Sequence, residues 1–400
     1  MTLVGNVPRQ RTVVLEMLGL VPGQIGGMET YARNLARALP ALDSRYRYLA
    51  VVGTEAQGLF QDGGGPIGVW VADPARPAWA RRVRPLRTLL QSAALARQLR
   101  RWAPDVVHCT LTFPKPAWGT RNMVITIHDL NFELLPGCWN PLDRRIMSLS
   151  CRLATRMAVA LVTISDFSKR TLIQTYGVSA DRVHVTPHGV RADLFAPAAD
   201  AGATAALRRD LDLPPEVLFF PANTWPHKNH ARLLEALAAL RETDGLRPCL
   251  VLTGSVKHGH RGVMDAVRRL GLRDQVRWLG YVDQRRLVAL YRAATALVFP
   301  SLHEGFGLPI LEAMACGCPV ACSRTTAAGE TAGDAALTFD PTDVSEIAHA
   351  LRALLQSEEL RRDLTRRGLR RADQFTWERS ARATLRVYDE VVSHVPIPGR

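Results

Sequence analysis

Short apolar runs alternate with longer amphipathic segments along most of the chain. In the first half the runs that predict strands are 12–18, 48–53, 105–110, 123–129 and 161–165. The segments that predict helices are 28–39, 86–101, 142–160 and 167–176. This alternation is typical of repeated strand-helix units, which build parallel sheets. The first half is therefore predicted to be an α/β unit.

A stretch rich in Ala, Pro and Asp interrupts this alternation, which then resumes. The later strand-like runs are 217–222, 248–254, 275–280, 296–301, 319–323 and 335–339, and the clearest helices are 231–242 and 344–357. A dozen parallel strands would be unusual in one open sheet, so two doubly wound, Rossmann-like α/β domains fit better. A ligand would then bind between the domains, at the carboxyl ends of the strands.

The expected domain limits follow from the position of that interruption. They are 1–195 for the first domain, 196–213 for the linker and 214–375 for the second domain, with a last helix at about 376–393 as a candidate to pack back on the first.

Composition agrees with two folded domains and limits the classes of function. The chain has 400 residues, of which 47% are apolar, and this excludes a disordered chain of low hydrophobicity. Lys and Arg total 51 against 37 Asp and Glu, a formal net charge of +14. The chain shows neither a signal-peptide pattern nor an apolar run of membrane-spanning length. We therefore expect a cytoplasmic protein, which at most lies peripherally on the inner face of the membrane.

The segment 299–323 carries the most chemical information. After a predicted strand, Glu304 opens a glycine-containing loop, Pro309 suits the first turn of a helix, and Gly317 suits its end. Backbone N–H groups at a helix start favour a phosphate or a sugar hydroxyl. Glu304 lies just before that helix and Glu312 about one turn into it, so both could face one cleft. Carboxylates there would accept hydrogen bonds from sugar or ribose hydroxyls.

The run E-G-F-G-L-P-x-L-E-A-M-A-x-G-x-P-V resembles that of the retaining, GT-B glycosyltransferases of family 4. The resemblance implies a GT-B fold, two domains facing each other across a cleft, and transfer of a hexose from a nucleotide-diphosphate sugar to an acceptor hydroxyl. It places Glu304 at the transferred sugar as a catalytic residue and Glu312 at the nucleotide ribose. The donor-binding residues that it adds from this run are Gly305, Phe306, Gly307 and Leu308.

Segment 219–237 resembles the first strand, loop and helix of the donor domain in that family. The resemblance makes Lys228 the residue that stabilises the departing nucleotide diphosphate. A cation has a physical purpose there, because cleavage of the sugar-phosphate bond leaves negative charge on phosphate oxygens. The family often has an Arg about five residues before this Lys, whereas this chain has Asn223, which we assign to the donor site. A second cation must therefore be absent or come from elsewhere.

Weaker matches extend the resemblance to the first half of the chain. In segment 19–39, Gly26 and Gly27 lie between the first predicted strand and the first predicted helix, without the full G-x-G-x-x-G spacing. We assign Gly26 to the acceptor side of the site and Gly27 to the donor side. His128 ends a predicted strand where the family has a catalytic His near the donor sugar. In 163–172, Ser165 is an acceptor-side candidate, and Lys169 is a weaker one.

Two later segments also match the family. Gly280 and Tyr281, after a predicted strand, fall where backbone groups recognise the nucleobase. Segment 329–341 matches as well, although Gly329 precedes Glu330 where Pro is common.

Metal candidates in the sequence have better structural explanations. Cys316, Cys318 and Cys322 lack a fourth ligand and C-x-x-C spacing, and the odd total of seven cysteines is typical of reduced thiols. Asp210 and Asp212 form the D-x-D string that metal-using glycosyltransferases need, but they lie in the linker before two prolines and fit turn chemistry. We therefore predict no metal and no cofactor beyond the nucleotide-sugar substrate.

Two other classes of function stay open. The positive net charge suggests nucleic-acid binding as one alternative. However, the arginines are scattered, and no basic motif with interleaved aromatic residues is present, so we expect no nucleic acid partner. A nucleotide-sugar epimerase or a phosphorylase would share the same architecture. An epimerase would convert a sugar nucleotide without any acceptor.

The acceptor is expected to be either a lipid-linked glycan, for a cell-surface polysaccharide or glycolipid, or a small natural product. Segment 81–102 bears arginines around Leu and Ala positions and could lie on an anionic membrane. It could also be a core-packed helix with a solvated basic face, which its few aromatic anchors favour. The arginines are Arg81, Arg82, Arg84, Arg87, Arg97, Arg100 and Arg101.

Overall fold

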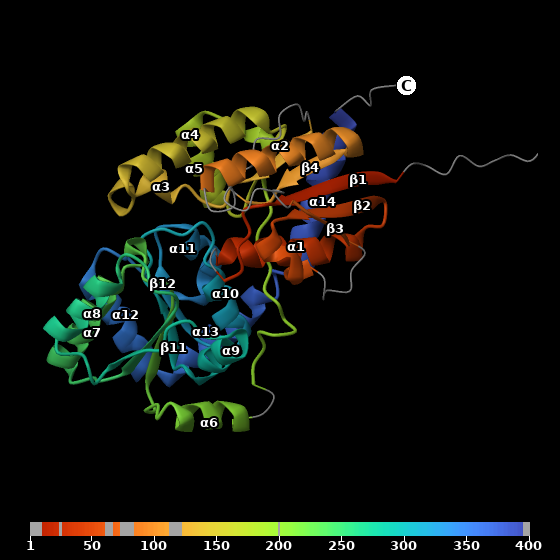
Figure 1. The fold of residues 1–400 in the computed structure, drawn as a ribbon. Coiled ribbons are helices and arrows are strands. Elements are labelled where there is room, and N and C mark those ends of the chain that lie inside the picture. Colours follow the sequence, from red (N-terminus) through yellow and green to blue (C-terminus); the bar gives the residue numbers. More distant parts are fainter. Residues whose placement is uncertain are drawn as a thin grey trace, which may run out of the picture.

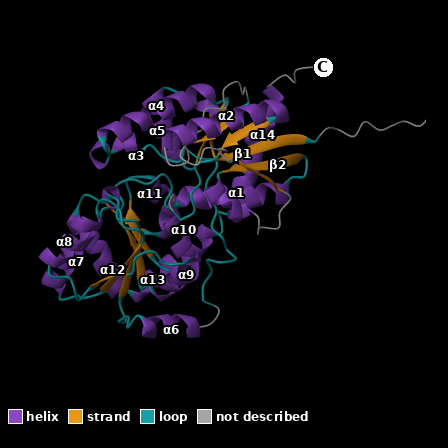
Figure 2. Cartoon of the chain, viewed as in Figure 1, coloured by secondary structure: helices purple, strands orange, loops and turns teal. Residues whose placement is uncertain are grey.

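The structure, a computed structural model, describes residues 10–23, 26–60, 67–72, 84–111, 122–198 and 201–394. Two α/β units lie one beside the other, each with a parallel sheet covered by helices (Figures 1 and 2). The prediction of two doubly wound domains is confirmed.

The first unit contains a seven-stranded sheet in the order β3-β2-β1-β4-β5-β6-β7, and all of its paired strands are parallel. Its strands are β1 (Arg11–Met17), β2 (Tyr46–Val52), β3 (Ile67–Val71), β4 (Val106–Cys109), β5 (Met123–Thr126), β6 (Ala160–Thr163) and β7 (Val183–Val185). Its helices are α1 (Gly27–Leu42), α2 (Arg84–Trp102), α3 (Asn131–Leu134), α4 (Pro141–Met157) and α5 (Asp166–Tyr176).

Apolar side chains on both faces hold this sheet between its helices. Along β1, Val13 and Leu15 belong to the core beneath α1, whereas Val14 belongs to the core beneath α2 and α4. Successive side chains of a strand point to opposite faces, so a continuous apolar run supplies both cores. This is why the buried strands read as uninterrupted apolar segments.

The second unit has a six-stranded parallel sheet in the order β10-β9-β8-β11-β12-β13. Its strands are β8 (Val217–Pro221), β9 (Cys249–Thr253), β10 (Val276–Trp278), β11 (Ala296–Phe299), β12 (Val320–Ser323) and β13 (Leu337–Phe339). Its helices are α6 (Ala201–Asp210), α7 (His230–Asp244), α8 (His260–Arg269), α9 (Gln284–Ala293), α10 (Leu308–Ala315), α11 (Ala327–Ala332), α12 (Val344–Gln356) and α13 (Glu358–Ala372). One continuous apolar core fills it.

The region expected to be a linker contains helix α6. Leu207 and Leu211 pack against the core of the second unit, and the Arg208 guanidinium donates a hydrogen bond to the Ala293 carbonyl at 2.6 Å. The helix is therefore attached to the second unit. The structure differs from expectation elsewhere too: strands β3 and β7 and helix α3 were not predicted, and α4 ends at Met157 instead of residue 160.

Two chain segments cross between the units side by side. The Val190 amide donates to the Phe375 carbonyl at 2.9 Å, and Val190 forms a parallel bridge with Thr376. A Cβ on Gly189 would lie 2.1 Å from the Trp377 nitrogen, so only glycine allows this approach. The crossing is thus a tightly packed pair of extended chain segments.

Helix α14 (Trp377–His394) follows the second crossing and packs on α1 of the first unit (Figure 1). Tyr388 is fully buried there, and its hydroxyl lies 2.6 Å from Nδ1 of His108 on β4. Tyr46 of β2 donates to Asp389 at 2.6 Å. The end of the chain thus completes the core formed by its beginning.

Within the described residues, no helix combines the length and the apolar character needed to cross a bilayer.

Candidate active site

A cleft of about 460 Å³ lies between the two units, at the carboxyl ends of strands from both sheets. In open parallel sheets ligands bind at this edge. Many of the residues that the sequence predicts for the site line this cleft. They are Gly26, Gly27, His128, Asn223, Lys228, Tyr281, Glu304, Gly305, Phe306, Gly307 and Leu308. Eleven positions widely separated in sequence therefore meet in one cavity.

Four other expected residues lie close to the cleft without lining it. Glu312 is one turn into α10, where it accepts a hydrogen bond from the Tyr291 hydroxyl at 2.8 Å. The Gly280 carbonyl accepts from the amide of Gly254, which itself lines the cleft, at 2.8 Å. Ser165 and Lys169 belong to the start of α5.

Lys228 and Glu304 form an ion pair in the cleft. The Nζ–Oε1 distance is 2.6 Å, and only 18% of the Lys228 side chain and 13% of the Glu304 side chain are exposed. Burial alone would raise the pKa of Glu304, but the positive charge and hydrogen bond of Lys228 outweigh it and keep this pKa below its usual value. Glu304 is therefore a carboxylate, and its partner is a cation that faces the cleft.

Two helices begin at this cleft. Gly307, with φ of 96°, is the residue before α10, and Gly26, with φ of 55°, is the residue before α1. Pro309 lies in the first turn of α10, as expected. Helix starts carry partial positive charge and free N–H groups, so two of them beside Lys228 make the cleft favourable for an anion such as a diphosphate.

His128 lies just beyond β5 and is held in a neutral form. Its Nε2 is 2.9 Å from the Thr110 carbonyl and therefore donates to it, which leaves Nδ1 as the acceptor. Burial lowers the pKa of His128 to about 4. Neutral His128 can position a sugar by accepting a hydroxyl hydrogen bond, but it cannot supply positive charge at pH 7.

An aromatic cluster surrounds His128 and connects the two units. Tyr31 of α1 contacts His128 edge-on at 5.0 Å between ring centroids and stacks on His188 at 5.2 Å. His188 in turn contacts Phe306 of the second unit at 5.0 Å. Neither ring nitrogen of His188 has a hydrogen-bond partner among the described residues, although it lines the cleft. No sequence motif marks His188, which lies just after β7 in the segment where the regular alternation of strands and helices pauses.

Asn223 binds the backbone of its own unit. Its Oδ1 accepts from the Ser255 amide at 2.6 Å and so connects the loops after β8 and β9. Gly254, which was not expected at the site, has φ of 132°, and a Cβ there would lie 2.6 Å from the Ala222 carbonyl. These contacts shape the wall of the cleft that the second unit contributes.

The cleft also contains groups that sequence reasoning missed. Asp129, next to His128, lines it, and burial raises the pKa of its carboxyl, with His303 opposing and Glu304 adding to the rise. The α3–α4 region contributes a largely apolar wall. Its residues are Asn131, Phe132, Trp139 and Met147. Only proximity in space identifies this wall, because its residues follow no motif.

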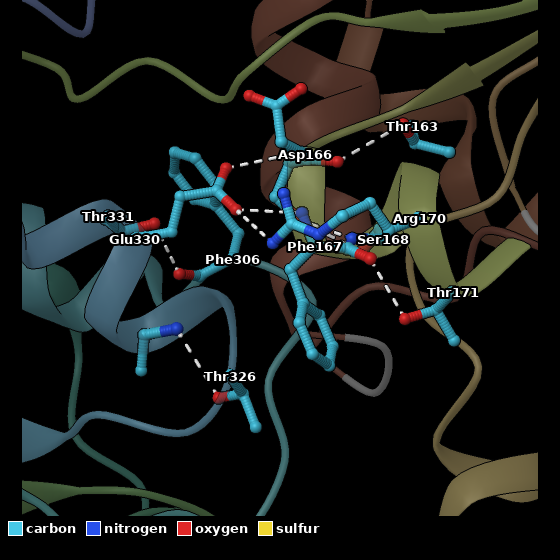
Figure 3. Close-up of polar contacts among 12 residues, drawn as sticks. Thr163, Asp166, Phe167, Ser168, Arg170, Thr171, Phe306, Thr326, Glu330 and Thr331 are labelled. Atoms are coloured by element: carbon cyan, nitrogen blue, oxygen red, sulfur yellow. Dashed lines mark hydrogen bonds and ion pairs between the residues drawn. The ribbon is translucent and has the colours of Figure 1, made fainter. Parts of the chain in front are cut away.

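Direct hydrogen bonds join the two units beside the cleft (Figure 3). Glu330 of α11 accepts from the amides of Asp166 and Phe167 at 2.8 Å each, and it lies 3.8 Å from the Arg170 guanidinium. The Ser165 hydroxyl donates to the Gly305 carbonyl at 2.7 Å. The start of α5 is therefore bound to the second unit from two directions.

The D-x-D string lies away from the cleft lining. Asp210 ends α6, and Asp212 is exposed and 3.7 Å from Arg277. Within the described ranges no group of three or more His, Cys, Asp or Glu side chains is arranged to hold a metal ion. All seven cysteines are free thiols.

Sequence families match both halves of the chain. Residues 25–194 match Glycosyltransferase Family 4, and residues 206–371 match Glycosyl transferases group 1. O-antigen chain mannosyltransferase B of Escherichia coli is 35% identical over 266 residues, which cover 66% of this chain and 69% of that enzyme. The D-inositol 3-phosphate glycosyltransferase of Saccharomonospora viridis is 34% identical over 242 residues, and this chain spans only 56% of its length.

Solved structures share the fold across nearly the whole chain. Anabaena Alr3699/HepE, in a complex with UDP and glucose, has a TM-score of 0.75 at 20% identity and covers 95% of this chain and 100% of its own. WaaG, a glycosyltransferase involved in lipopolysaccharide biosynthesis, has a TM-score of 0.71 at 18% identity, with 95% of this chain and 99% of its own covered. The two sheets, the cleft between them and these relatives lead to one conclusion: the chain belongs to the GT-B glycosyltransferases of group 1, family 4.

Proposed function

We propose that this glycosyltransferase moves a hexose from a nucleoside diphosphate sugar to an acceptor hydroxyl with retention of the anomeric configuration. The observation that carries the proposal is the Lys228–Glu304 pair, 2.6 Å apart beside the start of α10. It combines a cation for a diphosphate with a carboxylate for hydroxyls. The complex of the structural neighbour HepE with UDP and glucose supports this class of donor.

In this reaction the bond between the anomeric carbon and the phosphate oxygen breaks, and negative charge grows on the diphosphate. Lys228 and the N–H groups at the start of α10 would stabilise that charge. Diphosphate binding would compete with Glu304 for the Lys228 ammonium and so free the Glu304 carboxylate to accept sugar hydroxyls. Until then the ion pair would hold both side chains in the cleft.

Retention requires attack from the face that the leaving group vacates. Of the carboxylates at the cleft, Glu304 would be occupied by hydroxyls of the transferred sugar, and burial raises the pKa of Asp129 and so favours its neutral form. We therefore assign no covalent nucleophile. The acceptor hydroxyl would attack a short-lived oxocarbenium-like sugar on the same face, and its proton would pass to the departing phosphate oxygen. His128 and Glu304 would position the sugar.

The donor experiment uses a panel of UDP-, GDP- and dTDP-hexoses with EDTA in every assay. Mass spectrometry and release of the nucleoside diphosphate identify the donor, and turnover in EDTA is expected because we propose no metal. Glu304→Gln and Lys228→Ala should each lower turnover by about a hundredfold or more, since each removes a charge that stabilises the charges developing in the transition state. Lys228→Arg should retain more activity than Lys228→Ala.

Matched controls are Glu378→Gln on α14 and Arg362→Ala on α13, whose side chains are 59% and 77% exposed. Both should behave as wild type. Near wild-type turnover in Glu304→Gln and Lys228→Ala would contradict the site assignment. A new sugar nucleotide formed from donor alone would indicate an epimerase instead.

A further inference from the structure

Helix α4 has apolar side chains on two faces. Cys151 and Ala154 are buried in the core of the first unit. Leu142, Ile146 and Leu149 are 65%, 54% and 59% exposed, and Leu153 is 47% exposed. An ordinary surface helix buries its single apolar face and leaves a polar one outside. The second apolar face of α4 therefore has no partner among the described residues.

These four residues form one continuous stripe. At 3.6 residues per turn, positions 142, 146, 149 and 153 fall within about 60° of arc, and the stripe is roughly 16 Å long. Eight large apolar residues are exposed in the described part of the chain, and five of them lie between Leu134 and Leu153. The concentration on one helix distinguishes this patch from the scattered apolar residues that any surface has.

Positive charge lies along one edge of the stripe. The helical period places Arg145, Arg152 and Arg156 together on that flank, and all three are exposed. The chain as a whole carries a net charge of +14. If a second copy of the chain bound to the stripe, the arginines of the two copies would lie close together and repel each other. The headgroups of an anionic bilayer would instead neutralise their charge.

We propose that the α4 stripe docks the protein on the surface of an anionic lipid bilayer. Leucine and isoleucine side chains would enter the headgroup region, and the arginines would bind lipid phosphates, as in other interfacial helices. This assigns the contact to α4 in place of segment 81–102. From residue 90 to its end, α2 exposes only one large apolar side chain, Leu90 at 37%. Arg81 and Arg82 lie outside the described residues.

The same helix forms a wall of the cleft. Met147 on α4 and Trp139 just before it both line the cavity. A helix is roughly 10 Å across, so docking through the outer stripe would hold this wall about one helix width from the lipid headgroups. The short distance between the cleft and the membrane favours a lipid-linked acceptor, whose hydroxyl would reach the cleft from the membrane. This part of the inference rests on the proposed transfer reaction.

The test is flotation of the full chain with vesicles, without donor or acceptor. Wild type should bind vesicles that contain phosphatidylglycerol and bind pure phosphatidylcholine much more weakly. The double variant Ile146→Ser/Leu149→Ser should lower the vesicle partition coefficient by about tenfold or more, because two apolar side chains no longer insert. The matched control Leu90→Ser on α2 should bind as wild type does.

Charge is tested separately. Arg145→Glu/Arg156→Glu should weaken binding to phosphatidylglycerol vesicles at least about tenfold at low salt, whereas the exposed Arg362→Glu on α13 should not. Circular dichroism should be the same for all variants, since the altered side chains lie on the surface. Nucleoside diphosphate release without vesicles should also stay unchanged in the stripe variants, which separates failure of docking from failure of the proposed function.

Three outcomes would overturn the proposal. The first is absence of wild-type binding to anionic vesicles, and the second is unchanged binding by the stripe variant. The third is a wild-type dimer in sedimentation velocity that Ile146→Ser/Leu149→Ser converts to monomer, which would make the stripe an interface between copies of the chain.

Discussion

Glu312, on helix α10 beside the cleft, has a carboxyl group that is buried and titratable. Burial raises its pKa to about 7, and the hydrogen bond from Tyr291 partly opposes this rise. The ordinary value is 4.5, so the folded protein binds this proton more tightly than the unfolded chain does. The resulting stability is fully present below about pH 4.5 and is lost as the pH rises through about 7.

We therefore expect Glu312→Gln to flatten the pH dependence of stability. Gln still accepts the Tyr291 hydrogen bond but has no proton to lose, so its thermal midpoint should fall less than that of wild type between about pH 4.5 and 8. Thermal unfolding across this range measures the difference. Parallel curves for the two proteins would show that Glu312 does not titrate there.

The residues of the cleft differ in how far the sequence predicts them. Glu304, Lys228 and His128 follow strand ends, and parallel strands bring such positions to one edge. Asp129 and His188 gain their importance from neighbours distant in sequence, such as His303, Tyr31 and Phe306, which no local pattern reveals. The separation of Glu312 from the cleft lining also depends on tertiary packing, because helical spacing alone allows it to face either Tyr291 or the ligand.

At the scale of elements, the start of α5 is the main polar contact between the units. Glu330 accepts hydrogen bonds from two backbone amides at the start of α5, each at 2.8 Å (Figure 3). It therefore acts as an acidic helix cap, although it belongs to the other unit. A charge at a helix start and a capping bond are each worth about 1 kcal/mol. This contact therefore stabilises the observed arrangement of the two units.

Glu330→Ala removes both the charge and the capping bonds, so it should shift the equilibrium from this arrangement of the two units towards more open ones by roughly thirtyfold, which corresponds to about 2 kcal/mol. Small-angle X-ray scattering would detect this as a larger radius of gyration. Glu330→Gln should lie between wild type and Ala, because it keeps an acceptor and loses the charge. An identical radius for wild type and Glu330→Ala, with Glu378→Gln as the exposed control, would disprove this role.

Most elements could be predicted because their apolar periods are strong. Strand β3 was missed because its five residues, Ile67–Val71, include a glycine and only partly buried side chains. Helix α6 was missed because its Ala-rich sequence has weak amphipathic contrast. For α4, the pattern predicts a helix, yet it cannot distinguish an apolar face that the core covers from one that stays outside.

At the scale of the whole molecule, the paired crossing controls how the units can move. Gly189 lies so close to the Thr376–Trp377 backbone that a Cβ at position 189 would clash with it. Backbone atoms cannot relieve such a clash by changing rotamer, as a flexible side chain can. Gly189→Ala should therefore force the two crossing segments apart and cost roughly 2 kcal/mol or more of unfolding free energy. Denaturant unfolding gives this value.

Gly262→Ala is the matched control for that change. Gly262 lies inside α8, and a Cβ there would meet nothing within 4 Å. It should stabilise the protein by about 0.5–1 kcal/mol, because alanine favours a helix over glycine. Equal effects of the two substitutions would mean that the crossing is not sterically tight.

The packing of α14 on α1 means that the second unit is topologically an insertion. The chain leaves the first unit near Val190 and returns beside it at Phe375, and α14 then completes the core where the chain began. Chimeras between relatives should therefore be built with two junctions, one at each crossing segment. A single junction would leave Trp377 and Tyr388 facing a foreign α1, whereas the double exchange would place a different second unit on an intact first unit.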